Sequence, residues 1–246
     1  MRTDLETDEY DFGTGIYSIR PNGFFDQILE TLFRGVQYAY GFDVEGDIAE
    51  FGTMTGKTAG LLAHAIRVSD VQFEKNLRLA KLPVKNLHLF DSFKGLPSSD
   101  SSVVDSASPH VMSRIWREGA LQGMSAVQLA AHVGAIIESE RVLVHEGWFS
   151  ETLPRLEAST RFSLVHIDCD LYSSTIDVLD NLFHAGMISE GALLLFDDWN
   201  CNKASNAFGE RRAWAECVEK YHVHYSDEGS YGWASHKFII HDYRRS

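Results

Sequence analysis

The chain has 246 residues, 44% of them hydrophobic and 23% charged, which is enough for one large domain with a buried core and short for two. Its formal net charge of −13 argues against nucleic acid or an anionic membrane as the main partner. No apolar run reaches the roughly 20 residues of a membrane span, the acidic start lacks a signal core, and the three cysteines form no CxxC pair, so a cytoplasmic location is expected.

The first 45 residues are predicted to form an arm and one helix that precede the main domain. Residues 1–22 are polar and turn-rich, which is typical of an arm that folds over the body. Apolar residues recur at helical spacing over 24–40, and Gly41 then offers a stop. Residues 46–246 contain no internal repeat and no linker, and they are expected to form a single domain.

A repeating pattern follows, in which a short apolar run ends in an acidic residue and a helical or looped stretch comes next. The runs are rich in Val, Leu, Ile and Phe without polar alternation, as in strands that are buried on both faces. The gaps between them are long enough for the helical crossovers that parallel strands require. The acids that end the five runs are Glu50, Asp91, Glu146, Asp168 and the pair Asp197 and Asp198.

The remaining pattern completes an α/β fold. Helices are expected over 56–68, 126–140, 175–186 and 206–221, and strand-like segments at 221–226 and 236–243 are expected to pair as an antiparallel hairpin. The prediction is therefore a doubly wound sheet, mostly parallel with an antiparallel C-terminal strand. Such sheets bind ligands at the carboxyl ends of their strands, where the acids lie. The serine-rich stretch 97–109 has no period and predicts a mobile loop, and 97–120 is expected to act as a lid.

The glycine-rich segment 52–58, GTMTGKT, allows three interpretations. It is similar to a phosphate-binding loop that ends in Lys57 and Thr58, but that loop has four residues between its glycines and this one has three. A dinucleotide-binding loop needs a middle glycine, which is missing. The ExGxxxG pattern that begins at Glu50 is instead the loop of class I methyltransferases. Acidic strand ends suit the sulfonium, ammonium and ribose diol of S-adenosylmethionine, which has no phosphate.

Five separated blocks, in this order along the chain, are GDIAEFGTMTGKT, DSFKGLP, GWFSETLP, HIDCDLYSST and LLLFDDW. Together they resemble the macrocin O-methyltransferase (TylF-type) family, from about Gly46 to Trp214. That family methylates sugar hydroxyls on glycosylated natural products. The resemblance implies a class I methyltransferase (Rossmann-like) fold, S-adenosylmethionine as cofactor, and a divalent cation, usually Mg²⁺. The chain departs from the family at Lys57, where glycine is frequent, and at Trp199, where tyrosine is frequent.

The resemblance also implies residue roles. The metal-binding acids would be Asp168, Asp197 and Asp198, and Asp168 would also be the general base. Asp91 resembles the residue that binds the cofactor ribose, and 146–148 lie where the adenine should sit. The complete set of expected cofactor contacts is Glu50, Gly52, Thr53, Gly56, Thr58, Asp91, Ser92, Glu146, Gly147, Trp148 and Asp168.

Three neighbouring carboxylates repel one another unless they are protonated or bound to a cation, and oxygen ligands suit Mg²⁺. Asp170 and His166 are expected to have structural roles, while His110 and His145 are weaker candidates for an auxiliary base. The predicted function is metal-dependent O-methylation of a hydroxyl on a sugar or a glycosylated natural product, by a homo-oligomer without nucleic-acid or membrane partners. The alternatives are a metal-independent methyltransferase of the same fold and a non-catalytic cofactor-binding module.

Overall fold

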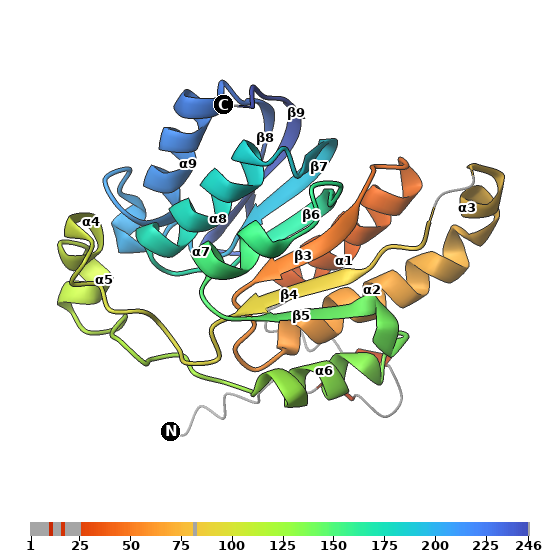
Figure 1. Cartoon of the computed structure of the whole chain (residues 1–246), viewed down its shortest axis with the longest axis horizontal. Coiled ribbons are helices and arrows are strands. Elements are labelled where there is room, and N and C mark those ends of the chain that lie inside the picture. The colour runs from red at the N-terminus through yellow and green to blue at the C-terminus, as the bar shows by residue number, and fades with distance from the viewer. Residues whose placement is uncertain (1–9, 12–15, 18–25, 81–82, 246) are drawn as a thin grey trace, which may run out of the picture.

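A computed structural model describes residues 10–11, 16–17, 26–80 and 83–245 (Figure 1). Most of the predicted arm at 1–22 therefore lies outside the described residues. Its described parts, β1 (Tyr10–Asp11) and β2 (Ile16–Tyr17), pair as antiparallel strands. The helix predicted over 24–40 is α1 (Asp26–Gly41). None of the helices in the described ranges is both long and apolar enough to cross a membrane.

A seven-stranded sheet forms the centre of the described chain, in the order β5–β4–β3–β6–β7–β9–β8. The first five of these strands pair in parallel, whereas β9 is antiparallel to both of its neighbours. This confirms the predicted doubly wound, mostly parallel sheet with an antiparallel C-terminal strand. The strands are β3 (Asp47–Phe51), β4 (Leu87–Asp91), β5 (Val142–Glu146), β6 (Phe162–Ile167), β7 (Ile188–Phe196), β8 (His224–Tyr231) and β9 (Ser235–Asp242).

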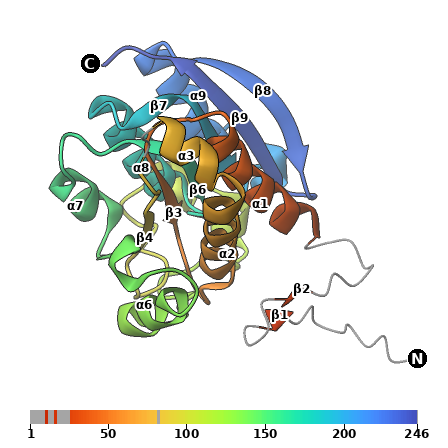
Figure 2. The same ribbon diagram turned by 90° about the vertical axis from the view of Figure 1, so that its right-hand side faces the viewer.

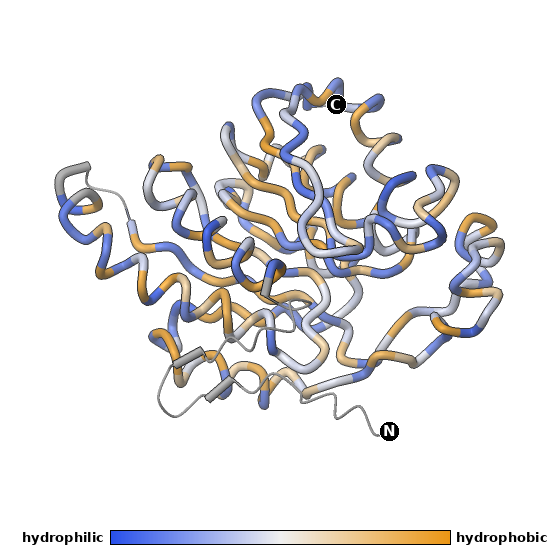
Figure 3. Tube along the Cα trace, turned by 180° about the vertical axis from the view of Figure 1, so that it is seen from behind, coloured by the Kyte–Doolittle hydropathy of each residue, from blue (hydrophilic) through white to orange (hydrophobic). Residues whose placement is uncertain are grey.

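Helices cover both faces of this sheet, as Figure 2 shows for α1 and α2 on one side and α7 and α8 on the other. Two hydrophobic cores result, one under α1, α2 and α6 and one under α8 and α9. Figure 3 shows the hydrophobic positions gathered along the central strands. Burial on both faces explains why the strands lack polar alternation. The helices are α2 (Lys57–Gln72), α3 (Glu74–Ala80), α6 (Ala126–Gly134), α7 (Phe149–Thr152), α8 (Tyr172–His184) and α9 (Gly209–Tyr221), with 3₁₀ turns η1 (Ser139–Arg141), η2 (Leu153–Arg155) and η3 (Asn202–Ala204).

Several helix boundaries differ from the sequence prediction: α2 continues to Gln72 instead of ending at residue 68, and α9 begins at Gly209 instead of residue 206. The predicted helix 126–140 ends at Gly134, because the chain turns back there and Ser139 packs against the glycine; a Cβ on Gly134 would lie 3.0 Å from the Ser139 Oγ. The helix predicted at 175–186 begins at Tyr172, where a distant aspartate caps it. The short helix α3 was not predicted.

The segment 97–120 is not the structureless loop that the sequence suggested. It contains α4 (Val103–Ser106) and α5 (Pro109–Met112), each preceded by a serine. The Asp105 amide donates to the Ser102 Oγ at 3.1 Å, so this serine is a helix cap and not a sign of disorder. Trp116 anchors the segment in a small buried cluster with Leu96 and Leu171. Its role as a lid stays a prediction.

Asp105 joins this segment to α8. Its side chain is buried and accepts hydrogen bonds from the amides of Tyr172 at 2.8 Å and Ser173 at 3.1 Å. We expect Asp105→Ala to lower the free energy of unfolding by about 1–2 kcal/mol, because two amides lose their acceptor. Urea denaturation measures this, with the exposed Asp100→Ala as the control, for which a change below about 0.5 kcal/mol is expected. Equal effects of the two substitutions would contradict the cap.

Candidate active site

The sheet changes its direction of growth between β3 and β6. The chain runs from β3 outward to β4 and β5 on one side, and from β6 to β7 on the other. The carboxyl ends of strands at such a switch point form a crevice in which ligands bind. A cavity of about 490 Å³ opens there. The predicted cofactor contacts that line it are Gly52, Asp91, Ser92, Gly147, Trp148 and Asp168.

The glycine-rich loop depends on Gly52. Its φ is +88°, and a Cβ at this position would lie 2.0 Å from the backbone oxygen of Asp168. Only glycine therefore lets β3 and β6 end side by side. Gly56, with φ +72°, and Thr58 lie at the start of α2 and are not among the residues that line the cavity.

Asp91 holds this loop in place. Its Oδ2 accepts hydrogen bonds from the Thr53 amide at 2.8 Å and from the Thr53 Oγ1 at 3.1 Å, while its Oδ1 accepts from the Phe93 amide at 2.7 Å. Thr53 is buried and points its hydroxyl to Asp91. Asp91 thus both shapes the loop and presents its carboxylate to the cavity.

Glu50 does not line the cavity, although the sequence predicted it as a cofactor contact. It is fully buried, and its Oε1 lies 3.0 Å from Nδ1 of His166, its register partner on β6. Burial lowers the pKa of His166, but the hydrogen bond to Glu50 and its charge outweigh burial and leave that pKa raised. The structural role of His166 stays a prediction, because its Nε2 is buried without a hydrogen-bond partner among the described residues.

Only part of the predicted adenine region, 146–148, lines the cavity. Gly147, with φ +140°, and Trp148 line the cavity, whereas Glu146 is exposed at the end of β5 and is absent from the lining. The Gly147 amide donates to the Asp91 backbone oxygen at 3.0 Å, which ties this turn to β4.

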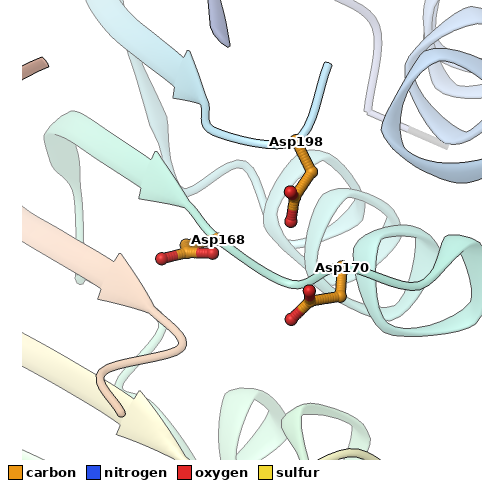
Figure 4. Close-up of side chains that lie close together, drawn as sticks. All are labelled: Asp168, Asp170 and Asp198. Atoms are coloured by element: carbon orange, nitrogen blue, oxygen red, sulfur yellow. The ribbon is translucent and has the colours of Figure 1, made fainter. Parts of the chain in front are cut away.

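Three carboxylates meet where β6 and β7 end. Asp168, Asp170 and Asp198 each offer an oxygen that lies within 4.8 Å of the others, and Figure 4 shows them at the ends of these neighbouring strands. The set differs from the predicted one, because Asp170 takes the place of Asp197. The Ser235 Oγ on β9 donates to the Asp197 Oδ1 at 3.2 Å. Asp197 and Asp198 lie in the bend that directly follows β7, and this bond ties the Asp197 side chain to β9.

The electrostatics of this cluster are unfavourable without a positive charge. Burial, and then the charges of Asp197 and Asp198, raise the pKa of Asp168 well above its usual range. The pKa of Asp170 is raised in the same way, and burial together with Asp197 raises the pKa of Asp198 to about 6. The Asp198 Oδ2 is buried without a hydrogen-bond partner among the described residues. Buried carboxylates this close suit a divalent cation with oxygen ligands.

The two histidines considered as auxiliary bases have other contacts. The backbone N–H of Asn202 donates a hydrogen bond to the Nδ1 of His110, at a distance of 3.0 Å. His145 stacks on Phe90 with ring centroids 4.2 Å apart, and burial lowers its pKa to about 4. Neither histidine is among the residues that line the cavity.

Two acids close to this cluster, Asp170 and Glu210, are not among the metal ligands predicted from the sequence. Asp170 carried a usable signal, since it follows Asp168 by two residues, but its φ of +59° decides where its side chain goes and is not visible in the sequence. Glu210 is a buried acid at the start of α9, and no role was predicted for it from the sequence.

Comparisons with known proteins agree with this geometry. Residues 26–223 match the sequence profile of the Macrocin-O-methyltransferase (TylF) family. Demethyldecarbamoylnovobiocin O-methyltransferase of Streptomyces niveus is 27% identical over 187 residues, which cover 75% of this chain and 65% of that protein. The 8-demethyl-8-(2,3-dimethoxy-alpha-L-rhamnosyl)-tetracenomycin-C 4'-O-methyltransferase of Streptomyces olivaceus is 28% identical over 189 residues, which cover 75% and 64%. Both alignments span less than two thirds of the relative's own length.

The solved structure of the O-methyltransferase NovP superposes with a TM-score of 0.67 at 22% sequence identity, over 88% of this chain and 80% of that one. At this identity the likeness shows a shared fold. The strand order and the helix layers of this chain are thus those of the fold of that O-methyltransferase.

Proposed function

The chain belongs to the macrocin O-methyltransferase (TylF) family, and from this premise we propose that it transfers a methyl group from S-adenosylmethionine to a hydroxyl of a sugar on a small natural product. Two similar proteins are named as O-methyltransferases, and the name of one includes a rhamnosyl group. The observation that carries the proposal is the charge of the cavity. Its described lining includes four acids and no lysine, arginine or histidine; the acids are Asp91, Asp168, Asp170 and Asp177.

This lining fits S-adenosylmethionine and disfavours a phosphate-bearing cofactor, because carboxylates repel phosphate and attract a sulfonium or an ammonium. Asp91 offers a carboxylate to the ribose diol, and Trp148 offers a ring for packing against adenine. Gly52 lets the methionine portion approach the backbone closely, since no side chain intervenes. The cofactor supplies an electrophilic methyl group.

Asp168 is the proposed general base. It lines the cavity and directly follows the last residue of β6, so it sits between the cofactor loop and the acids after β7. Its carboxylate faces the same cavity as the cofactor loop, where it can accept a proton from an acceptor hydroxyl. The Asp168 carboxylate would take the proton of the acceptor hydroxyl while the Asp168 backbone oxygen keeps its position against Gly52.

The proposal also includes a divalent cation bound next to Asp168. Asp168, Asp170 and Asp198 would hold it, because their oxygens are close together and the Asp198 Oδ2 has no hydrogen-bond partner within the described part of the chain. When bound, such a cation lowers the pKa of a hydroxyl that coordinates it and orients that hydroxyl. Asp197 would support the site from outside through its bond to Ser235.

Removal of divalent cations is expected to stop methyl transfer and to leave cofactor binding within a few-fold of its original strength. The reason is that the acids after β6 and β7 would hold the cation, whereas the loops after β3, β4 and β5 would bind most of the cofactor. Methyl transfer to glycosylated acceptors and calorimetry with S-adenosylhomocysteine, with EDTA and then with added Mg²⁺, measure both quantities. Transfer that survives EDTA would favour a metal-independent methyltransferase, and binding without transfer to any acceptor would favour a non-catalytic module.

Three expectations from the sequence stay predictions. They are a cytoplasmic location, the lack of nucleic-acid and membrane partners, and a homo-oligomer. Light scattering after size-exclusion chromatography measures the last of these, and a monomer at all concentrations would contradict it.

A further inference from the structure

Glu210 is a buried acid that the proposed reaction leaves without a role. It lies in the first turn of α9 and is 1% exposed. Neither of its carboxylate oxygens has a hydrogen-bond partner in the part of the chain that the structure describes. Buried polar groups are normally hydrogen-bonded, because burying them unpaired costs free energy. An orphaned, buried carboxyl therefore calls for a partner of another kind.

A structural role for this acid lacks the contacts it would need. Acids in the first turn of a helix usually stabilise the free amides at its start. Glu210 accepts no hydrogen bond from those amides, and it has no ion-pair partner among the described residues. Glu216 on the same helix shows the ordinary arrangement, since it pairs with Arg212 and accepts a hydrogen bond from Tyr172.

The surroundings of Glu210 are those of the carboxylate cluster. A Cβ on its neighbour Gly209 would lie 3.9 Å from the Asp170 backbone oxygen, so α9 begins against the turn that carries Asp170. Burial raises the pKa of Glu210 well above its usual range, and the charges of neighbouring acids raise it further. These acids, in order of their effect, are Asp198, Asp197, Asp168 and Asp170.

We propose that Glu210 is an outer carboxylate of the cation site, which accepts a hydrogen bond from a water in the hydration shell of the divalent cation held by Asp168, Asp170 and Asp198. Glu210 is not in the group whose oxygens lie within 4.8 Å of one another, so the proposal places it outside the direct ligands and gives it a contact through water. Mg²⁺ keeps several of its waters in proteins, and these need acceptors. The inference rests on the proposed function, since it needs the cation.

The test compares Glu210→Gln with Glu216→Gln as the matched control on the same helix. The full chain is titrated with Mn²⁺, the free ion is followed by electron paramagnetic resonance, and Tm is measured with and without Mn²⁺. We expect Glu210→Gln to weaken Mn²⁺ binding about 10- to 100-fold, as for other groups that orient metal ligands. The same substitution should raise the Tm of the metal-free protein, because it removes a buried acid. Glu216→Gln should leave the Mn²⁺ affinity unchanged.

The outcomes separate this inference from the proposed function. Unchanged Mn²⁺ affinity in Glu210→Gln, beside normal binding by the wild type, would overturn the role of Glu210 and leave the cation site standing. A lower Tm of the metal-free variant would also overturn it, since a purely structural residue behaves in that way. Failure of both Glu210→Gln and Glu210→Met to fold counts equally against it. Absence of Mn²⁺ binding by the wild type would remove the cation site and this inference together.

Discussion

Replacing Asp168 by asparagine is expected to lower kcat by about 1,000-fold, because the variant loses the general base and one of the proposed cation ligands. The substitution keeps the shape of the side chain and the backbone oxygen that faces Gly52. S-adenosylhomocysteine should therefore bind within a few-fold of its wild-type affinity. Initial rates of methyl transfer with an acceptor that the wild type methylates, together with calorimetry, measure the two quantities separately.

Asp180→Asn is the control for this substitution. Asp180 lies on α8 and accepts hydrogen bonds from Lys220 and Tyr221, away from the cavity. Its substitution should leave kcat within twofold of the wild type. Wild-type turnover in Asp168→Asn would exclude Asp168 as the base. A parallel loss of S-adenosylhomocysteine binding would instead assign the residue to cofactor binding alone.

Replacing Gly52 by alanine is expected to lower the free energy of unfolding by about 3 kcal/mol and to weaken S-adenosylhomocysteine binding at least tenfold. Part of the loss is the strain of a positive φ, and part is the overlap of the new Cβ with the Asp168 backbone oxygen, 2.0 Å away. That oxygen belongs to the backbone beyond β6 and has no rotamer into which it can move. Urea denaturation and calorimetry measure the two effects.

Gly229→Ala is the matched control, because Gly229 also has a positive φ, +79°, while a Cβ there would meet nothing within 4 Å. It should lose only about 1 kcal/mol, from backbone strain alone. The difference between the two variants measures the packing of β3 against β6. Equal losses would show that backbone strain, and not the approach of the two strands, makes glycine necessary at position 52.

The fold was predictable because each buried parallel strand appears in the sequence as a short apolar run that ends at an acidic residue. β3 to β7 all fall on such runs, and the C-terminal hairpin follows from two close strand-like segments. The boundaries of α8 were not predictable in the same way. Its first residue, Tyr172, depends on Asp105, 67 residues earlier in the chain, and no local pattern contains that contact.

The sequence predicted which residues lie at the strand ends of the candidate site, but it did not predict where their side chains point. The sequence placed Glu50 at the end of β3, yet whether its side chain faces the cavity or His166 depends on the register between β3 and β6. Asp197 and Asp198 are adjacent, and only the position of Ser235 on β9 shows which of the two turns away. Serines in 97–120 suggested disorder because their role as helix caps depends on contacts that the composition does not reveal.

The place of β9 in the sheet has a consequence for how the nascent chain folds during its synthesis on the ribosome. This strand is the last of the described strands in sequence, yet it lies between β7 and β8, and its Ser235 holds Asp197. Until about residue 242 has been synthesised and has left the exit tunnel, the apolar β7 exposes an unpaired edge, which is a template for misassociation. The side chain of Asp197 gains its hydrogen bond from Ser235 only when β9 covers that edge.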